Sequence, residues 1–243
     1  MNNNVLIDVG NTACKVAYAC GREIGKTVTS GSGENPYQFL THQLGDNFFD
    51  TVVFSSVQRY DAELVAWLES HCGKLIVVDG NTPTALKIDY QTSDRLGADL
   101  LASGLGAILR FPGRDVAVFG FGTAITIGAI DGEGRFLGVN ISPGFQMRLK
   151  ALHQYTQGLP LIQLGEEELI PDMGTDTRGA IAAGVVQGIL YEIEGYIARN
   201  QDKKIIFTGG DALFFAKRLK TPIFVDCNLI FMGLAEIAQS YVE

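Results

Sequence analysis

The order of apolar and polar positions along the first half of the chain predicts strands that alternate with helices. Short apolar runs bounded by turn residues are typical of buried strands, and apolar residues spaced three or four apart indicate helices. Strands are expected at residues 5–7, 15–19, 23–28, 51–55 and 74–78. Helices are expected at residues 36–44, 61–71 and 94–109.

The second half repeats this order. Strands are expected at residues 115–119, 125–130, 136–141, 204–207 and 222–225, and helices at 143–153, 178–198, 212–219 and 228–242. A polar stretch at residues 154–176, punctuated by Pro and Gly, is expected to connect them. Each half opens with a strand, a glycine turn and two further strands, which indicates a duplicated architecture. We therefore predict an α/β fold of two lobes around a cleft, residues 1–112 and 113–243, with the glycine turns at the cleft.

Composition excludes several classes of protein. The chain has 243 residues, of which 47% are hydrophobic and 19% charged, so it is not disordered. Its net charge of −8, without a Lys/Arg cluster, argues against binding nucleic acid. Its four Cys and three His lack zinc-site spacing. With neither a signal peptide nor a membrane span expected, the predicted compartment is the cytoplasm.

The first glycine turn has the residues of a phosphate site. Asp8-Val9-Gly10-Asn11-Thr12 follows the first strand, and Lys15 lies on the next. Backbone N–H groups of such a turn can bind phosphate and Lys can neutralise its charge, while Asp8 could hold Mg²⁺ through water. The alternative is a plain β-hairpin in which Asp8 and Asn11 make Asx-turn hydrogen bonds.

Two more glycine turns follow apolar strands. Gly122-Thr123-Ala124 is the second, with a plain hairpin as the alternative. Thr208-Gly209-Gly210-Asp211-Ala212 lies between a strand and a helix, where the alternative is a loop with Asp211 as the helix N-cap. The three turns match neither a Walker loop nor a Rossmann fingerprint. Together they indicate a nucleotide site of another kind.

Asp99 is the candidate general base. It lies among small and apolar residues in the helix predicted at 94–109, where a carboxylate could accept a proton from a hydroxyl. The alternative is an ion pair with Arg95, four residues earlier. Thr177, before a long apolar helix, has an alternative role as its N-cap. Tyr90 has no local signal of its own.

Taken in order, these segments resemble the type III pantothenate kinases, of the acetate and sugar kinase/Hsc70/actin superfamily. Residues 8–15, Asp-Val-Gly-Asn-Thr-Ala-Cys-Lys, are similar to the family's first phosphate motif, and Gly122-Thr123-Ala124 to the core of its second. Tyr90 with Leu96-Gly97-Ala98-Asp99 is similar to its pantothenate-binding stretch. Pro143-Gly144, residues 176–184 and residues 208–212 match later patterns. The resemblance covers residues 5 to about 235.

The resemblance implies two ribonuclease H-like lobes, as in actin-like ATPases, and ATP-dependent phosphorylation of pantothenate on its 4′-hydroxyl, the first step toward coenzyme A. It implies Asp99 as the base and Asp8 as the Mg²⁺ ligand, through water. It also implies a homodimer that uses Mg-ATP and a monovalent cation, K⁺ or NH₄⁺. The residues implied for ATP are Asp8, Val9, Gly10, Asn11, Thr12, Ala13, Cys14, Lys15, Thr123, Gly209 and Gly210. Those implied for pantothenate are Tyr90, Gly97, Ala98, Leu100 and Thr177.

The chain departs from the family pattern at two positions. Gly120 stands where the family has an Asp that binds the monovalent cation, and Leu100 stands where it has an Arg after the base. The first change removes a charge that would hold a cation, and the second leaves open what binds the pantothenate carboxylate. Two alternatives therefore stay open: a kinase of the same superfamily for another small hydroxyl compound, and a nucleotide-binding regulatory protein without catalysis.

Overall fold

The computed structural model describes residues 3–92 and 96–241, which fold into two compact units. Unit 1 comprises Met1–Arg114, Ile130–Gly138 and Asn228–Glu243, and unit 2 comprises Asp115–Ala129 and Val139–Cys227. The first chain crossing between the units thus falls at residues 114–115. Unlike the simple division expected at residue 112, two later segments of the chain belong to unit 1.

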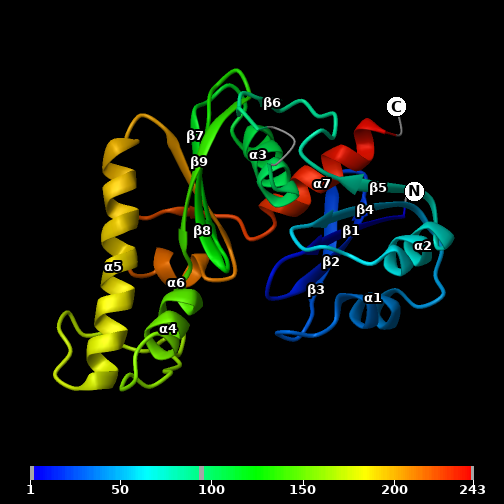
Figure 1. Cartoon of the computed structure of the whole chain (residues 1–243). Helices are drawn as coiled ribbons and strands as arrows, with labels where there is room; N and C mark the ends of the chain where they lie inside the picture. Colours follow the sequence, from blue (N-terminus) through cyan, green and yellow to red (C-terminus); the bar gives the residue numbers. More distant parts are fainter. Residues whose placement is uncertain (1–2, 93–95, 242–243) are drawn as a thin grey trace. The chain divides into compact units, whose positions relative to one another are not determined.

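Unit 1 is built on a five-stranded mixed sheet of order β3-β2-β1-β4-β5 (Figure 1). The strands are β1 (Asn4–Val9), β2 (Cys14–Cys20), β3 (Glu23–Thr29), β4 (Phe49–Ser56) and β5 (Cys72–Val78). Strand β1 pairs antiparallel with β2 and parallel with β4, which places Asp8 beside Lys15 on one side and Ser55 on the other. The central strand therefore carries Asp8 between a cation and a hydroxyl.

Both faces of this sheet are covered, which is why all six residues of β1 are buried. Val5, Ile7 and Val9 pack in one cluster with α1 (Pro36–Leu44) and α2 (Ala62–Ser70). Side chains alternate along a strand, so Leu6 faces the other way, where α7 (Leu229–Ser240) contacts β1 and β4.

The C-terminal helix belongs to unit 1 because it packs closely on α3 (Ala98–Arg110). A β-carbon on Gly233 of α7 would overlap the backbone carbonyl of Ala102, and one on Gly106 of α3 would overlap that of Leu229. The absence of side chains at these positions lets the two helix backbones meet. Arg22 and Glu236 form an ion pair that ties α7 to the turn after β2.

The second sheet has the order β11-β10-β7-β8-β9-β6. Its strands are β6 (Lys87–Ile88), β7 (Val116–Phe121), β8 (Ala124–Ile130), β9 (Arg135–Pro143), β10 (Lys204–Gly209) and β11 (Phe224–Val225). Within unit 2, α4 (Phe145–Gln154), α5 (Thr177–Arg199) and α6 (Ala212–Ala216) bury one face of it around a cluster rich in Phe. Figure 1 shows the long helix α5 alongside this sheet.

The predicted elements are present, with shifted ends. Strands β1, β2 and β4 each extend beyond the apolar run that predicted them, and α6 ends at Ala216 rather than 219. The two-residue strand β6 was not expected, because its ladder with β9 joins residues far apart in sequence. Helix α3 begins at Ala98, so the start expected at residue 94 was too early, because Leu96 and Gly97 precede the helix.

Candidate active site

The first glycine turn joins β1 to β2 and is closed by its own backbone. The Gly10 amide donates to the Ala13 carbonyl at 3.0 Å, and the Gly33 amide donates to the Thr12 carbonyl at 3.2 Å. The Gln58 side-chain amide donates to the Gly10 carbonyl at 2.6 Å. Asn11 and Thr12 are exposed, while Cys14 is buried. The turn is thus a supported loop whose tip faces solvent.

Asp8 is a buried carboxylate, and one of its oxygens accepts no hydrogen bond from the described residues. This oxygen, Oδ1, is itself buried. Burial raises the pKa of Asp8 to about 6; the positive charge of Lys15 and the nearby Ser55 hydroxyl pull it down, while the negative charge of Asp99 raises it further. The structure therefore brings Asp8, Lys15 and Asp99 into one electrostatic cluster.

Asp99 lies in the first turn of α3, directly after Ala98. Burial raises its pKa, although backbone N–H groups of Leu100 and of Asp99 itself lower it in part. Gly97 is the N-cap, and its carbonyl accepts from the Leu101 amide at 3.0 Å. A β-carbon on residue 97 would lie 2.5 Å from Asp99 Oδ1. Arg95, the alternative ion-pair partner, lies outside the described residues.

The cluster of Asp8, Lys15 and Asp99 fits a divalent cation whose remaining ligands come from a substrate. A buried carboxylate oxygen without a partner, next to a second carboxylate, is the environment in which a bound cation relieves repulsion. Among the described residues no group of three or more His, Cys, Asp or Glu could hold a metal alone. Mg²⁺ commonly binds through one or two carboxylates, with water and substrate phosphates completing its shell.

The residues expected to bind pantothenate lie in different parts of the fold. The Tyr90 ring contacts Phe136 edge-on, with 6.4 Å between centroids, so β9 supports it. Gly97, Ala98 and Leu100 flank Asp99 at the start of α3. Thr177 lies in unit 2 and is exposed at the first position of α5. It is not the N-cap that the alternative predicted, because Asp176 caps this helix by accepting from the Gly179 amide at 2.8 Å.

The second glycine turn, in unit 2, joins β7 to β8. The Gly122 amide donates to the Ala124 carbonyl at 3.1 Å, and the Thr123 carbonyl accepts from the Gly144 amide at 3.0 Å. Gly120, two residues before the turn, pairs with Thr208 of β10. A β-carbon on Gly120 would lie 2.6 Å from Thr126 Oγ1, so this hydroxyl occupies the space of the missing side chain.

The third turn lies directly beside the second within unit 2. Gly209 pairs with Phe121 at a φ of +98°, and a β-carbon there would overlap the Phe121 backbone. Gly210 is exposed with open space around it. Asp211 is at the N-cap position of α6 but makes no side-chain capping bond, and burial raises its pKa. Two glycine turns thus meet at one sheet end.

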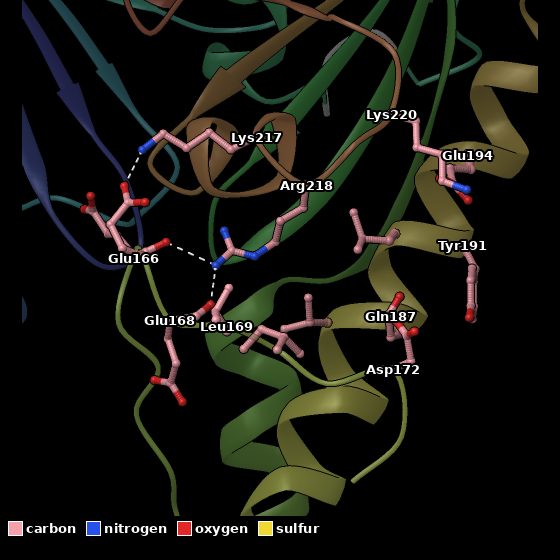
Figure 2. Close-up of a pocket in the computed structure, with 14 residues that line it drawn as sticks. Glu166, Glu168, Leu169, Asp172, Gln187, Tyr191, Glu194, Lys217, Arg218 and Lys220 are labelled. Atoms are coloured by element: carbon pink, nitrogen blue, oxygen red, sulfur yellow. Dashed lines mark hydrogen bonds and ion pairs between the residues drawn. The ribbon is translucent and has the colours of Figure 1, made fainter.

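A hollow of about 700 Å³ elsewhere in unit 2 contains none of the predicted site residues. Figure 2 shows Arg218 pointing to the loop at residues 166–168, where it donates to the carbonyls of Glu166 at 3.1 Å and Glu168 at 2.9 Å. Lys217 pairs with Glu167 at 2.6 Å. These charged side chains hold the loop on unit 2, beside the hollow.

Two residues of the candidate site escaped the sequence motifs. Ser55 lies beside Asp8 in the parallel ladder, and Gln58 holds the Gly10 carbonyl. Thr208, which the third motif did include, has a buried hydroxyl without a hydrogen-bond partner among the described residues. A signal for Ser55 existed, because the carboxyl ends of neighbouring parallel strands meet at one edge of a sheet. No sequence signal pointed to Gln58, because its hydrogen bond to the Gly10 carbonyl depends on the geometry of the loop.

The fold is that of the actin-like ATPases. The chain is similar over 98% of its length to 98% of a "conserved putative Baf family transcriptional activator" from Campylobacter jejuni, with a TM-score of 0.65 and 23% identity. It is also similar to the activator of the 2-hydroxyisocaproyl-CoA dehydratase from Clostridium difficile, solved with bound ADPNP, with a TM-score of 0.57, 16% identity and coverage of 99% and 97%. These likenesses establish the architecture alone.

Sequence relatives identify the family within this class. The type III pantothenate kinase family model matches residues 4–199. A type III pantothenate kinase from Porphyromonas gingivalis is 36% identical over 98% of this chain and 99% of its own, and one from Bacteroides fragilis is 38% identical over 96% of both. The chain belongs to the type III pantothenate kinase family and is a kinase, a phosphotransferase with an alcohol group as acceptor. Among the described residues no helix has the length and apolarity to cross a membrane.

Proposed function

We propose that the chain transfers the γ-phosphate of ATP to the 4′-hydroxyl of pantothenate, with Asp99 as general base. The observation that carries this proposal is the buried Oδ1 of Asp8, unpartnered among the described residues, beside Lys15 in the β1–β2 ladder, with the half-buried Asp99 near enough for its charge to raise the pKa of Asp8. In kinases one carboxylate can help to hold the metal while another accepts the proton of the attacking hydroxyl.

Asp99 suits the role of base because burial raises its pKa toward the working pH, which strengthens it as a proton acceptor. Asp8 suits the metal, because its Oδ1 is buried and unpartnered and sits on a rigid central strand. Mg²⁺, when bound with ATP, would neutralise charge on the phosphates. Lys15, next to Asp8 in the β1–β2 ladder, adds a positive charge for the same phosphates.

The remaining assignments follow the family resemblance and the local geometry. We propose that the turn at residues 9–14 binds ATP phosphates through its backbone, and that Thr123, Gly209 and Gly210 of unit 2 also contact ATP. Tyr90, Gly97, Ala98, Leu100 and Thr177 are proposed to bind pantothenate. Tyr90 is supported by its packing on Phe136, and Gly97 by its closeness to Asp99.

The monovalent cation and the assembly are also proposals. At Gly120 the space of the family's cation-binding Asp is occupied by the Thr126 hydroxyl, which is neutral, so we propose that turnover does not require K⁺ or NH₄⁺. A homodimer in the cytoplasm is the assembly and compartment that the resemblance implies.

The test measures ADP released from Mg-ATP with and without pantothenate. The wild type should show pantothenate-dependent release, and Asp99→Asn should lower kcat by about 10²–10⁴-fold while ATP and pantothenate still bind. Asp46→Asn, which changes an exposed carboxylate of the same unit, is the matched control and should match the wild type.

Other outcomes distinguish the alternatives. Near wild-type turnover by Asp99→Asn would refute its role as base. ATP binding without any pantothenate-dependent release would support the non-catalytic regulatory protein. Release that depends on another small alcohol, but not on pantothenate, would support the related kinase.

A further inference from the structure

A charged network in unit 2 holds the end of β9 and the start of α4. Arg148 of α4 donates from Nε to the Pro143 carbonyl at 2.8 Å, and its Nη2 pairs with Oε2 of Glu192 on α5. The Ser142 hydroxyl donates to Glu192 Oε1 at 2.5 Å, and Arg148 Nη2 also contacts this hydroxyl at 3.4 Å. One guanidinium and one carboxylate thus fix three elements.

The Arg148–Glu192 pair is better shielded from water than a surface ion pair. The Arg148 and Glu192 side chains are only 23% and 21% exposed. An ion pair that is screened by water contributes little to stability. Removal of one partner from a partly desolvated pair costs more, because it leaves the other charge uncompensated. Arg148 also uses its planar guanidinium for several acceptors, which a lysine cannot reproduce.

The segment held by this network supports the second glycine turn. Gly144, directly after Pro143, donates its amide to the Thr123 carbonyl at 3.0 Å. A β-carbon on Gly144 would overlap the carbonyls of Gly122 and Thr123, so the two backbones are in direct contact. Any shift of residues 142–144 therefore moves the turn that presents Thr123.

We infer that Arg148 and Glu192 are positioning residues, which hold the Gly122-Thr123-Ala124 turn in its ATP-binding geometry through Ser142, Pro143 and Gly144. The inference rests on the proposed ATP contact of Thr123. Neither side chain needs to touch ATP, since the effect passes through the Gly144 amide.

The experiment compares Glu192→Gln with Tyr196→Phe. Glu192→Gln keeps the size of the side chain and removes the charge that pairs with Arg148. Tyr196→Phe is the matched control, because Tyr196 accepts a hydrogen bond from Asn140 at 3.0 Å and so also ties α5 to β9, away from the turn. Arg148→Lys tests whether a positive charge alone is enough.

Three quantities are measured in the full chain: amide hydrogen exchange at residues 119–126, the Kd of Mg-ATP and the Kd of pantothenate. Glu192→Gln should speed exchange in this segment and weaken Mg-ATP binding at least about fivefold, as expected when a bond to a charged group is lost. Arg148→Lys should weaken it less. Pantothenate binding should stay at the wild-type value in these variants, and Tyr196→Phe should leave all three quantities unchanged.

Thr123→Ala separates this inference from the proposed function. If Thr123→Ala weakens Mg-ATP binding and Glu192→Gln does not, the positioning role is wrong and the ATP contact stands. If Thr123→Ala has no effect, the ATP contact fails, and with it the positioning role, although faster exchange would still show the mechanical link. Equal weakening by Glu192→Gln and Tyr196→Phe would overturn the inference, because it would indicate a general loosening of α5.

Discussion

The Asp99 carboxylate occupies space that exists only because residue 97 is glycine. Its Oδ1 lies 2.5 Å from the point where a β-carbon on Gly97 would stand. Gly97 is also the N-cap of α3, so one residue both begins the helix and leaves room for the carboxylate. The orientation of the proposed base is therefore set two residues before it.

Gly97→Ser is expected to lower kcat at least about tenfold, because a misplaced catalytic group is costly even when it moves by 1 Å. Serine is a favourable N-cap, so the free energy of unfolding should change by less than about 1 kcal/mol. Steady-state kinetics and urea unfolding measure the two effects.

The control for this variant is Gly195→Ser on α5, where a β-carbon meets nothing within 4 Å. It makes the same substitution and should leave kcat unchanged. Wild-type kcat in Gly97→Ser would show that Asp99 does not need this space.

Asp8 should make the protein less stable as the pH rises. Its pKa is about 6 in the folded chain against 3.8 for the free group, so the folded state binds more protons between these values. Replacement by Asn removes this penalty. Asp8→Asn should be more stable than the wild type by about 1.5 kcal/mol at pH 5 and about 3 kcal/mol at pH 7.5, from about 1.4 kcal/mol per pKa unit.

Urea unfolding at the two pH values measures this difference, and Asp46→Asn should show none. A wild type that gains stability relative to Asp8→Asn above pH 6 would contradict the raised pKa.

The same titration predicts that Mg-ATP binding weakens below about pH 6, since a protonated carboxyl no longer attracts the metal.

Gly209 and Gly210 should differ sharply although they are neighbours. Gly209→Ala places a β-carbon against the Phe121 backbone at a φ of +98°, and should reduce the free energy of unfolding by more than about 2 kcal/mol. Gly210→Ala meets open space and should change it by less than about 1 kcal/mol.

Urea denaturation of both variants measures the difference. Equal stability of Gly209→Ala and Gly210→Ala would mean that the Phe121 backbone can move to accommodate the new β-carbon. If Gly210 contacts ATP as proposed, Gly210→Ala should weaken ATP binding while the free energy of unfolding stays within about 1 kcal/mol of the wild type.

Exchange of K⁺ for Na⁺ is expected to change kcat/KM for ATP by less than about twofold, because Gly120 supplies no carboxylate to attract a monovalent cation at this position. Gly120→Asp should introduce a dependence on K⁺ if the Thr126 hydroxyl can turn away from the new side chain. Pantothenate-dependent ADP release in each salt measures both. Strong dependence of the wild type on K⁺ would show that another group supplies the missing charge.

Local patterns predicted much of this protein. The apolar run ending at Asp8 predicted a buried strand that delivers a carboxylate to a glycine turn, and β1 does so. The order of the phosphate motifs indicated the family that the relatives identify. These signals lie within a few residues of one another, where chain geometry restricts the outcome.

The sequence by itself therefore determined the order of the elements, the family and the candidates for chemistry. Tertiary structure alone decided that Gln58 reaches the Gly10 carbonyl, that α7 joins unit 1 and that Arg148 reaches Glu192, 44 positions further along the chain. It also decided the raised pKa of Asp8, because desolvation depends on what other segments pack around the side chain. Contacts between distant segments leave no local pattern, and they set the environment in which each candidate residue acts.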